Sequence, residues 1–432
     1  MPSNSRTPID LTIRAYNVGF GDCNLLTFRY QNFSRNILID FGSTRRPANS
    51  KRNNTKLVAK QIGKDCDGKL DAIVATHRHK DHISGFLSNA SGTGAGDIIR
   101  KLEPDFIVQP WTEHPGAPVD ANVAPSLKSF HAHQKRFADM DVFARSIGPQ
   151  LRRLGGVSLE FKRRLKFMGE NNISNLAAIK NLQRMADEAK DRGENSRHGG
   201  YFVYSGSNSG LGHLLPNVDV HVLGPPTLKQ TETIKNQVHD HSDEFWHLQA
   251  ENHSAFAEDE SLFPGRETTF TPSYARWFKR RLQQLRADDL FRIVRILDNA
   301  LNNTSVILLF TVGKRGFLFP GDAQWENWAY ALNQPKYVKL LKNVELYKIG
   351  HHGSLNATPK SLWSLFRNKG PAGTKNRMQS ILSTKEGVHG KPENDSEVPR
   401  GKLIRELREQ SKLIDTRNSG TASHCVKTVI KF

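Results

Sequence analysis

The sequence contains little cysteine and no long apolar run. Its three cysteines, Cys23, Cys66 and Cys425, are an odd number with no spacing that suggests pairing. This scarcity argues against a disulfide scaffold and a zinc–thiolate site, and it favours a reducing compartment. No stretch of about 18 apolar residues occurs, and residues 1–9 lack the apolar core of a secretion signal. We therefore expect a soluble cytoplasmic protein that does not bind a membrane.

Acidic residues are also scarce relative to basic ones. The chain has 62 lysines and arginines against 43 aspartates and glutamates, which gives a formal net charge of +19. This excess favours anionic partners, nucleic acid above all, and a basic surface without such a role is the alternative. A protein partner and any oligomeric state remain open. The length of 432 residues suits one large domain with insertions, or two domains.

The strongest local signal is an apolar run that leads directly into ligand-type side chains. Residues 72–75 are Ala-Ile-Val-Ala, and Thr-His-Arg-His-Lys-Asp-His follows at 76–82. This order predicts a buried strand that ends in a metal site. His77 and His79 are two residues apart, so in extended backbone their imidazoles point the same way and can grip one ion. Asp81 and His82 follow where the chain turns toward a helix, and they can hold a second ion.

The type of ligand limits the type of metal. Imidazole and carboxylate groups without a nearby thiolate suit borderline ions such as Zn²⁺ or Mn²⁺. We therefore expect two divalent ions, zinc or manganese, as cofactors.

The pattern His77-x-His79-x-Asp81-His82 after a short apolar strand resembles the first metal motif of the metallo-β-lactamase-fold hydrolases. Further motifs follow in the order of that family: Pro-Gly-Asp at 320–322 and His-His-Gly-Ser at 351–354, each after an apolar strand. The resemblance implies an α/β fold, a four-layer αββα sandwich with helical insertions. It also implies that Asp322 bridges the two metals.

The opening Asn17-x-Gly-x-Gly-Asp22 resembles one branch of the family, which includes the metallo-β-lactamase-like domain of the DNA-uptake competence protein. By this resemblance Asp40 braces the metal loop from behind. His351 or His352 supplies the last imidazole ligand, with His352 favoured, and the other histidine can donate a proton to the leaving group. His389 resembles a loop histidine that reaches the pocket in that branch.

The predicted site residues fall into three groups. The catalytic candidates are Asp81, His351 and His389, and the metal ligands are His77, His79, Asp81, His82, Asp322 and His352. Residues expected to support the ligands or contact the substrate are Asp40, Asn302, Asn303, Ser305, Ser354, Asn356, Thr358 and Lys360.

One departure from the family concerns a further histidine ligand before the bridging aspartate. His213 and His221 lie in range, but the position just before the hairpin holds Asn302, Asn303 and Ser305. We therefore expect fewer protein ligands at the first metal, and so weaker binding or a water molecule in that place.

Helical and strand patterns divide the chain into five parts. Residues 1–118 form the N-terminal half with the first metal motif, and 201–226 return to the same core. Residues 119–200 are read as a basic helical insertion and 227–300 as a second, largely helical one, where we expect substrate choice to be made. Residues 301–432 form the C-terminal half, with the bridging aspartate and the His-His-Gly-Ser motif.

Two ions about 3.5–4 Å apart lower the pKa of a bridging water and take up charge in the transition state. We therefore expect a hydrolase, and the leading hypothesis is a nuclease that cleaves phosphodiesters of DNA or RNA. Hydrolysis of a small phosphodiester, a nucleotide signal or a phosphorylcholine-like ester is an alternative. A module that binds metal and needs a partner for activity is the third possibility.

Overall fold

The computed structural model describes the chain in several segments. They are residues 7–48, 50, 54–114, 175–193, 197–227, 229–231, 302–356, 358–390, 392, 396–419 and 424–432. Most of the two predicted insertions lies outside these residues. Within these segments, no helix has both the length and the apolar character needed to cross a membrane.

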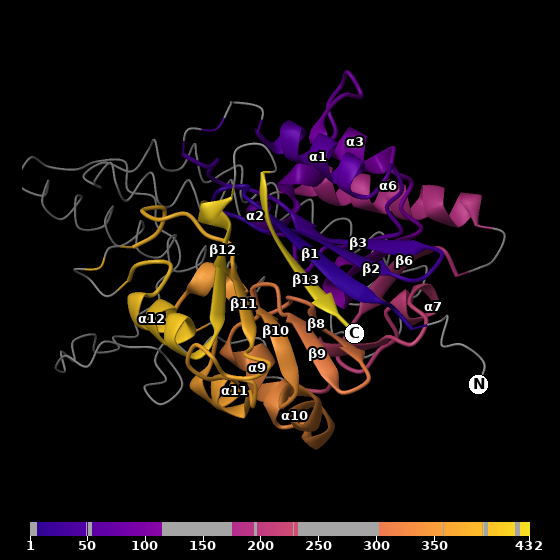
Figure 1. Ribbon diagram of the computed structural model, residues 1–432. Coiled ribbons are helices and arrows are strands. Elements are labelled where there is room, and N and C mark those ends of the chain that lie inside the picture. The colour runs from indigo at the N-terminus through magenta and orange to yellow at the C-terminus, as the bar shows by residue number, and fades with distance from the viewer. Residues whose placement is uncertain are drawn as a thin grey trace, which may run out of the picture.

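The first sheet has seven strands in the order β13-β1-β2-β3-β4-β5-β6 (Figure 1). Pairing is antiparallel from β13 to β3 and parallel from β3 to β6. The buried apolar run at 72–74 forms a central parallel strand, as such runs do when both faces of a sheet are covered. The strands are β1 (Asp10–Tyr16), β2 (Cys23–Arg29), β3 (Ser34–Phe41), β4 (Ala72–Val74), β5 (Phe106–Pro110), β6 (Gly199–Val203) and β13 (Cys425–Lys431).

The second sheet has six strands in the order β12-β11-β10-β9-β8-β7. The hairpin predicted at 306–319 is present as the antiparallel pair β8 and β9, and pairing is parallel from β9 to β12. The strands are β7 (Asp219–Gly224), β8 (Ile307–Val312), β9 (Arg315–Phe319), β10 (Val344–Lys348), β11 (Gln379–Leu382) and β12 (Lys412–Asp415).

The two sheets face each other across one apolar core. Side chains of both sheets meet there, and the rings of Phe28 on β2 and Phe310 on β8 lie 5.8 Å apart. Each outer face carries a layer of helices (Figure 1). The first sheet is covered by α1 (Asn54–Asp65), α3 (Ala95–Arg100) and α6 (Leu176–Arg192), the second by α9 (Trp325–Leu332), α10 (Pro335–Leu341), α11 (Lys360–Leu365) and α12 (Gly401–Gln410). The predicted α/β sandwich class is confirmed.

Short helical segments complete the described elements. They are the α-helices α2 (Lys80–Ile83) and α7 (Leu211–Leu214) and the 3-10 helices Ser84–Phe86, Trp111–Glu113, Gly350–Gly353 and Thr416–Asn418.

Helix α6 lies in the range expected for the first insertion, but it belongs to the sandwich. Its apolar residues recur at helical spacing, and Ile179, Leu182 and Met185 are buried in the outer core of the first sheet. The outer helical layer of the first sheet therefore includes a segment from the middle of the chain.

The predicted motifs follow strands that end at the same edge of the sandwich. Loop 75–79 follows β4, loop 320–324 follows β9, and segment 349–354 follows β10. The strands of a parallel set end at one edge, so their following loops gather there. This arrangement brings residues more than 200 positions apart to one place.

Candidate metal centre

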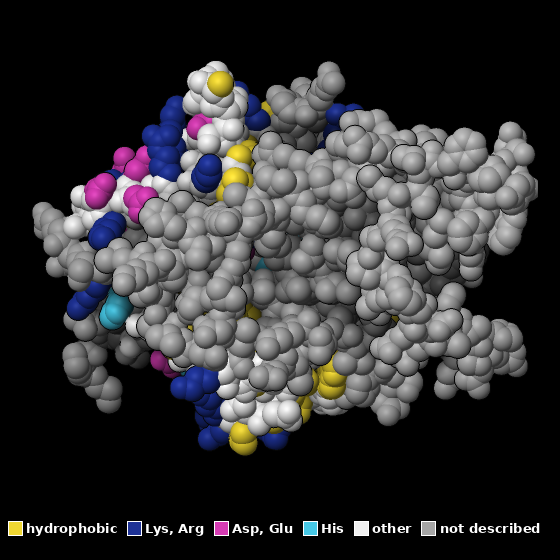
Figure 2. All heavy atoms as spheres, turned by 180° about the vertical axis from the view of Figure 1, so that it is seen from behind, with side chains coloured by type: hydrophobic (Ala, Val, Ile, Leu, Met, Phe, Trp, Pro, Cys, Tyr) yellow, Lys and Arg dark blue, Asp and Glu magenta, His cyan; other side chains and the backbone are white. Residues whose placement is uncertain are grey.

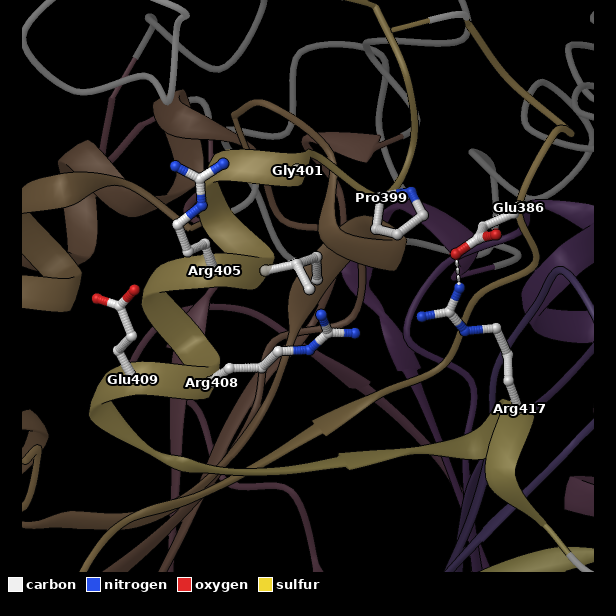
Figure 3. Close-up of a pocket in the computed structure, with 8 residues that line it drawn as sticks. Glu386, Pro399, Gly401, Arg405, Arg408, Glu409 and Arg417 are labelled. Atoms are coloured by element: carbon white, nitrogen blue, oxygen red, sulfur yellow. Dashed lines mark hydrogen bonds and ion pairs between the residues drawn. The ribbon is translucent and has the colours of Figure 1, made fainter. Parts of the chain in front are cut away.

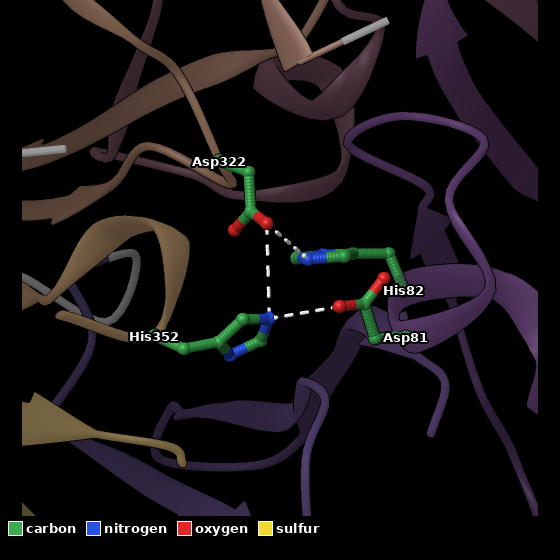
Figure 4. Close-up of side chains that lie close together, drawn as sticks. All are labelled: Asp81, His82, Asp322 and His352. Carbon is green, nitrogen blue, oxygen red and sulfur yellow. Dashed lines mark hydrogen bonds and ion pairs between the residues drawn. The ribbon is translucent and has the colours of Figure 1, made fainter. Parts of the chain in front are cut away.

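Asp81, His82, Asp322 and His352 form a buried group, here called the four-residue cluster (Figure 4). Their potential ligand atoms all lie within 4.8 Å of one another. The Nε2 atom of His352 is 3.1 Å from Oδ2 of Asp81 and 3.7 Å from Oδ2 of Asp322. The Nε2 atom of His82 is 3.0 Å from the same oxygen of Asp322. Two imidazoles and two carboxylates therefore converge on one point.

The other nitrogen of each imidazole faces an acceptor outside the cluster. Nδ1 of His352 lies 3.0 Å from the carbonyl oxygen of Ser383, and Nδ1 of His82 lies 2.8 Å from Oδ2 of Asp40. A carbonyl oxygen can only accept, so Nδ1 of His352 carries a hydrogen. This is the arrangement of metal-binding histidines, in which an outer acceptor fixes the ring and directs Nε2 at the ion.

The electrostatics of the cluster favour positive charge at its centre. Burial would lower the pKa of His82, but Asp322 and Asp40 outweigh it and raise that pKa well above its ordinary value. The pKa of His352 is raised in the same way against its burial, by Asp322 and Asp81. Burial would raise the pKa of Asp322, but His82 and His352 hold it well below its usual range. A divalent cation supplies the same positive charge, so the donor set fits a metal ion.

His77 and His79 lie beside the cluster. The ring centroid of His77 is 4.2 Å from that of His82 and 4.7 Å from that of His79. Burial, with His82 and His79 adding to it, lowers the pKa of His77 well below its ordinary value, so this ring is neutral. Its Nε2 is buried and has no hydrogen-bond partner among the described residues. Neither His77 nor His79 belongs to a group of three or more potential ligands among these residues, but a neutral imidazole with an unpartnered nitrogen can accept an ion.

The His351-His352 segment has unusual backbone geometry. Both histidines adopt left-handed conformations, with φ of 42° and 54°. Such conformations are uncommon for residues other than glycine and cluster at functional sites. The N–H of His351 donates to Oδ1 of Asp322 at 3.0 Å. The turn thus places His352 in the cluster and the half-buried His351 at its edge. From the sequence alone, either histidine could have been the ligand.

Asp40 lies behind the metal loop, where it was expected. It accepts hydrogen bonds from the backbone N–H of Thr76 at 2.7 Å and from the Thr76 hydroxyl at 2.8 Å, in addition to its contact with His82. Burial raises the pKa of Asp40, against the opposing effect of His82. One carboxylate therefore fixes both the start of the loop and one of its imidazoles.

Two glycines allow the loops to approach closely. A Cβ on Gly42, just after β3, would lie 2.3 Å from the backbone nitrogen of His82. Gly321 has a φ of +56°, and a Cβ there would lie 2.7 Å from the Thr76 side chain. Only glycine fits at these positions, so the Asp-Phe-Gly and Pro-Gly-Asp motifs serve the packing of the loops as well as their turns.

The other predicted residues surround the cluster at different depths. His389 packs its ring 4.7 Å from that of Phe20, which in turn lies 4.3 Å from the ring of His352. Thr358 is buried, with its hydroxyl 2.8 Å from that of Tyr347, so it supports the segment from within. The hydroxyl of Ser354 donates to Asn356 at 3.3 Å, and Lys360 is exposed at the start of α11.

The segment before the hairpin is buried and polar. The hydroxyl of Ser305 accepts from the backbone N–H of Asp322 at 3.3 Å. The side-chain oxygens of Asn302 and Asn303 are buried without a hydrogen-bond partner among the described residues. His221 instead lies 3.2 Å from the Thr311 hydroxyl, and His213 is exposed on α7. Neither histidine joins the potential ligand groups of the described residues.

Sequence reasoning missed four buried charged residues next to the ligands. Asp22 entered only as part of the motif Asn17-x-Gly-x-Gly-Asp22, and Lys348 was assigned no role, yet their side chains form a buried ion pair. Arg78, between two histidine ligands, pairs with Glu113. A lysine at the end of β10, directly after Leu346 and Tyr347, was the one available signal, since burial of a charge requires a partner.

No protein-family model matches the sequence, and comparison with curated proteins gives no match.

Proposed function

We propose that this chain is a dinuclear metal-dependent hydrolase of the metallo-β-lactamase-fold type, and that it cleaves phosphodiester bonds of nucleic acid. The observation that carries the proposal is the convergence of His82 and His352 on Asp322, with Asp81 beside them. The buried, unpartnered nitrogen of His77 supports a second metal position. The order of motifs on strand ends supports the family assignment.

Two divalent ions, zinc or manganese, would supply Lewis acidity and a water with lowered pKa when bound. Asp81, His82, Asp322 and His352 would hold one ion, and His77 and His79 would contribute to the other; by the family resemblance Asp322 would serve both. Asp81 is also placed to orient the water and accept its proton. His351 lies at the rim of the cluster, which suits a group that donates a proton to the leaving oxygen.

A cleft at α12, lined by three arginines together with Glu386 and Glu409, supports a polymeric substrate (Figure 3). It has a volume of about 460 Å³, and its lining includes Arg405, Arg408 and Arg417. In Figure 3 Arg408 reaches from α12 toward Arg417, which pairs with Glu386. Among the described residues, the guanidinium groups of Arg405 and Arg408 have no ion-pair partner. Free guanidinium groups bind phosphate well.

The cleft is connected to the His352 segment. Pro399 lines the cleft, and its Cβ lies within 3.1 Å of where a Cβ on Gly353 would stand. The backbone N–H of Arg400 donates to the carbonyl of Gly353 at 2.8 Å. A nucleic-acid strand cleaved at the metal centre could therefore continue over Pro399, and its next phosphates could contact Arg405 and Arg408.

The described surface is basic elsewhere too. Figure 2 shows lysine and arginine side chains gathered at the lower edge of the molecule, on the side where α10 and α11 lie. On the helices of the first sheet, acidic and basic side chains alternate instead (Figure 2). Neutralisation of several phosphates by such side chains makes nucleic-acid binding dependent on salt.

The test is cleavage of labelled single- and double-stranded DNA and RNA by metal-stripped protein to which Mn²⁺, Mg²⁺ or Zn²⁺ is returned. We expect metal-dependent cleavage that Asp81→Ala and His352→Ala abolish. His213→Ala, at an exposed histidine on α7, is the matched control and should keep full activity. Two bound metals without cleavage of any of these substrates would contradict the nuclease and favour a small phosphodiester or a module that needs a partner.

A further inference from the structure

A buried ion pair lies directly behind the proposed centre. Nζ of Lys348, at the end of β10, is 2.7 Å from Oδ2 of Asp22, and the two side chains are only 3% and 2% exposed. Lys348 also donates to the carbonyl of Ile349 at 3.0 Å. The pair joins residues 326 positions apart. It therefore connects the N-terminal half of the sandwich to the segment that carries His352.

Asp22 contacts both ligand segments. Its backbone N–H donates to the carbonyl of Asp81 at 2.8 Å, and its carbonyl accepts from Gly42 at 3.0 Å. Its Oδ1 lies 3.7 Å from Nδ1 of His352 and has no hydrogen-bond partner among the described residues. The carboxylate thus stands behind the imidazole, on the side opposite Asp81 and Asp322.

Lys348 also neutralises a second buried acidic group. Asp22, Asp40 and His82 have potential ligand atoms within 4.8 Å of one another, so this group could itself attract a cation. The ammonium of Lys348 supplies that positive charge. Because the charge of Lys348 balances that of Asp22, Asp22 does not need a metal ion, and the ion binds at the four-residue cluster instead.

Stability alone gives little reason for such a pair. Replacement of a buried ion pair by apolar residues of similar volume is often neutral or stabilising, whereas removal of one partner is strongly destabilising. A purely structural pair could therefore be exchanged as a unit without effect on the site. The contacts of Asp22 with Asp81 and His352 indicate a different role.

We propose that Asp22 and Lys348 are positioning residues for the metal held by the four-residue cluster. The carboxylate of Asp22, held in place by Lys348, lies 3.7 Å from Nδ1 of His352 and acts on that ring through its charge, beside the contact with the Ser383 carbonyl at 3.0 Å. This inference rests on the proposed metal centre and deepens it. It predicts that loss of the pair weakens the binding of one metal ion more than the other.

The experiment is a stepwise titration of metal-stripped full-length protein with Mn²⁺ or Zn²⁺, in which calorimetry measures the heat of each binding step. The test variant is Asp22→Asn with Lys348→Met, which leaves no unpaired charge. We expect one of two binding steps to weaken by about 10- to 100-fold, as loss of outer partners of metal ligands does. The melting temperature without metal should change little.

A control comes from the ion pair of Arg35 and Asp71, with an N–O distance of 3.0 Å, in which Asp71 is buried and Arg35 is 38% exposed. It joins the starts of β3 and β4, away from the strand ends that carry the ligands. Arg35→Met with Asp71→Asn removes the same two charges and should leave both binding steps unchanged. Equal weakening in both double variants would overturn the proposal, because the effect would then be a general loss of stability.

The outcomes also separate this inference from the proposed function. A wild-type chain that binds no metal would contradict the metal centre itself. A wild-type chain that binds two ions, with unchanged binding in the Asp22→Asn, Lys348→Met variant, would contradict only the positioning role. If that variant does not fold, Asp22→Asn with Lys348→Gln removes both charges but keeps a neutral hydrogen bond between the two side chains, and the same step should weaken; unchanged binding there would overturn the proposal.

Discussion

Arg78 and Glu113 form a two-pronged ion pair inside the protein. Nε and Nη2 of Arg78 lie 3.0 and 2.9 Å from the two carboxylate oxygens of Glu113, and both side chains are buried. Arg78 stands between His77 and His79, the proposed ligands of the second ion, and Glu113 lies in the short helix after β5. The paired geometry allows little rotation, so it fixes the backbone on which both imidazoles are mounted.

Removal of Glu113 should therefore affect both stability and metal binding. Glu113→Ala leaves a buried guanidinium without its main partner, and we expect a loss of about 3–5 kcal/mol in the free energy of unfolding. Urea denaturation measures this loss. The control is Arg184→Ala, which breaks the exposed pair with Glu188 and should cost at most about 1 kcal/mol. Similar small losses in both variants would show that the Arg78 pair does not hold the loop.

Asp322 should be the most sensitive carboxylate of the centre. Asp322→Asn removes the negative charge that faces both His82 and His352, and we expect the metal content to fall from two ions per chain to one or none. Elemental analysis by mass spectrometry after gel filtration gives this number. Asp219→Asn, at an exposed position on β7, is the control and should retain two ions.

Metal removal should lower thermal stability. An ion that binds only the folded chain stabilises it by about 2.7 kcal/mol at a free concentration of 100 times its Kd. We expect the melting temperature to fall on chelation and to return when Zn²⁺ or Mn²⁺ is restored. In Asp322→Asn the same additions should have little effect. A melting temperature that is independent of metal in the wild-type chain would argue against bound ions.

Substitution in the cleft lined by Arg405, Arg408 and Arg417 should have a defined effect on nucleic-acid binding. Arg408→Glu should weaken binding and reduce the dependence of log K on log salt by about one, because one phosphate contact is lost. Fluorescence anisotropy at several salt concentrations measures both. Lys190→Glu reverses an exposed charge on α6, at the opposite outer layer, and should change the slope much less. Equal slopes for the two variants would place the nucleic acid elsewhere.

His351 and His389 can be distinguished by kinetics. A residue that donates a proton to the leaving group contributes about 10²–10⁴-fold to the rate. We expect His351→Ala to lower kcat within this range and to retain both metals, since its ring lies outside the four-residue cluster. The ring of Phe20 packs against those of both His389 and His352, and His389 is not among the ligands of the four-residue cluster, so His389→Ala should have the smaller effect. A larger loss of kcat in His389→Ala than in His351→Ala would instead identify His389 as the proton donor.

Local pattern was enough to predict the ligand segments. The apolar run at 72–75 and the strands before 320 and 349 are short, buried and flanked by turn residues, so their ends could be located in the sequence. Periodicity also predicted helical structure within 119–200, where α6 lies, but not that this helix packs on the first sheet. That packing depends on the match between its buried face and the sheet, which the spacing of one segment does not contain.

The outer supports of the site could not be predicted in the same way. Asp22 lies in a glycine-rich turn, where an aspartate usually has a local role. Its contact with Lys348 exists only after two distant segments meet. Likewise, the choice between His351 and His352 depended on a left-handed backbone turn, and no residue type specifies such a turn at consecutive histidines. Pairings across the chain follow from the fold, so only the structure reveals them.

The hydrogen bond of Gly42 to Asp22 and the ion pair of Asp22 with Lys348 join parts of the chain that are synthesised at different times. A growing polypeptide presents His77, His79 and His82 long before Asp322 and His352 leave the ribosome. Until then the exposed imidazoles have no bridging carboxylate, and any ion they catch is held loosely and exchanges. If the proposed centre binds metal, its assembly must therefore wait for closure of the second sheet, a slow, long-range event. A chain that folds without metal at that moment would then have an empty centre.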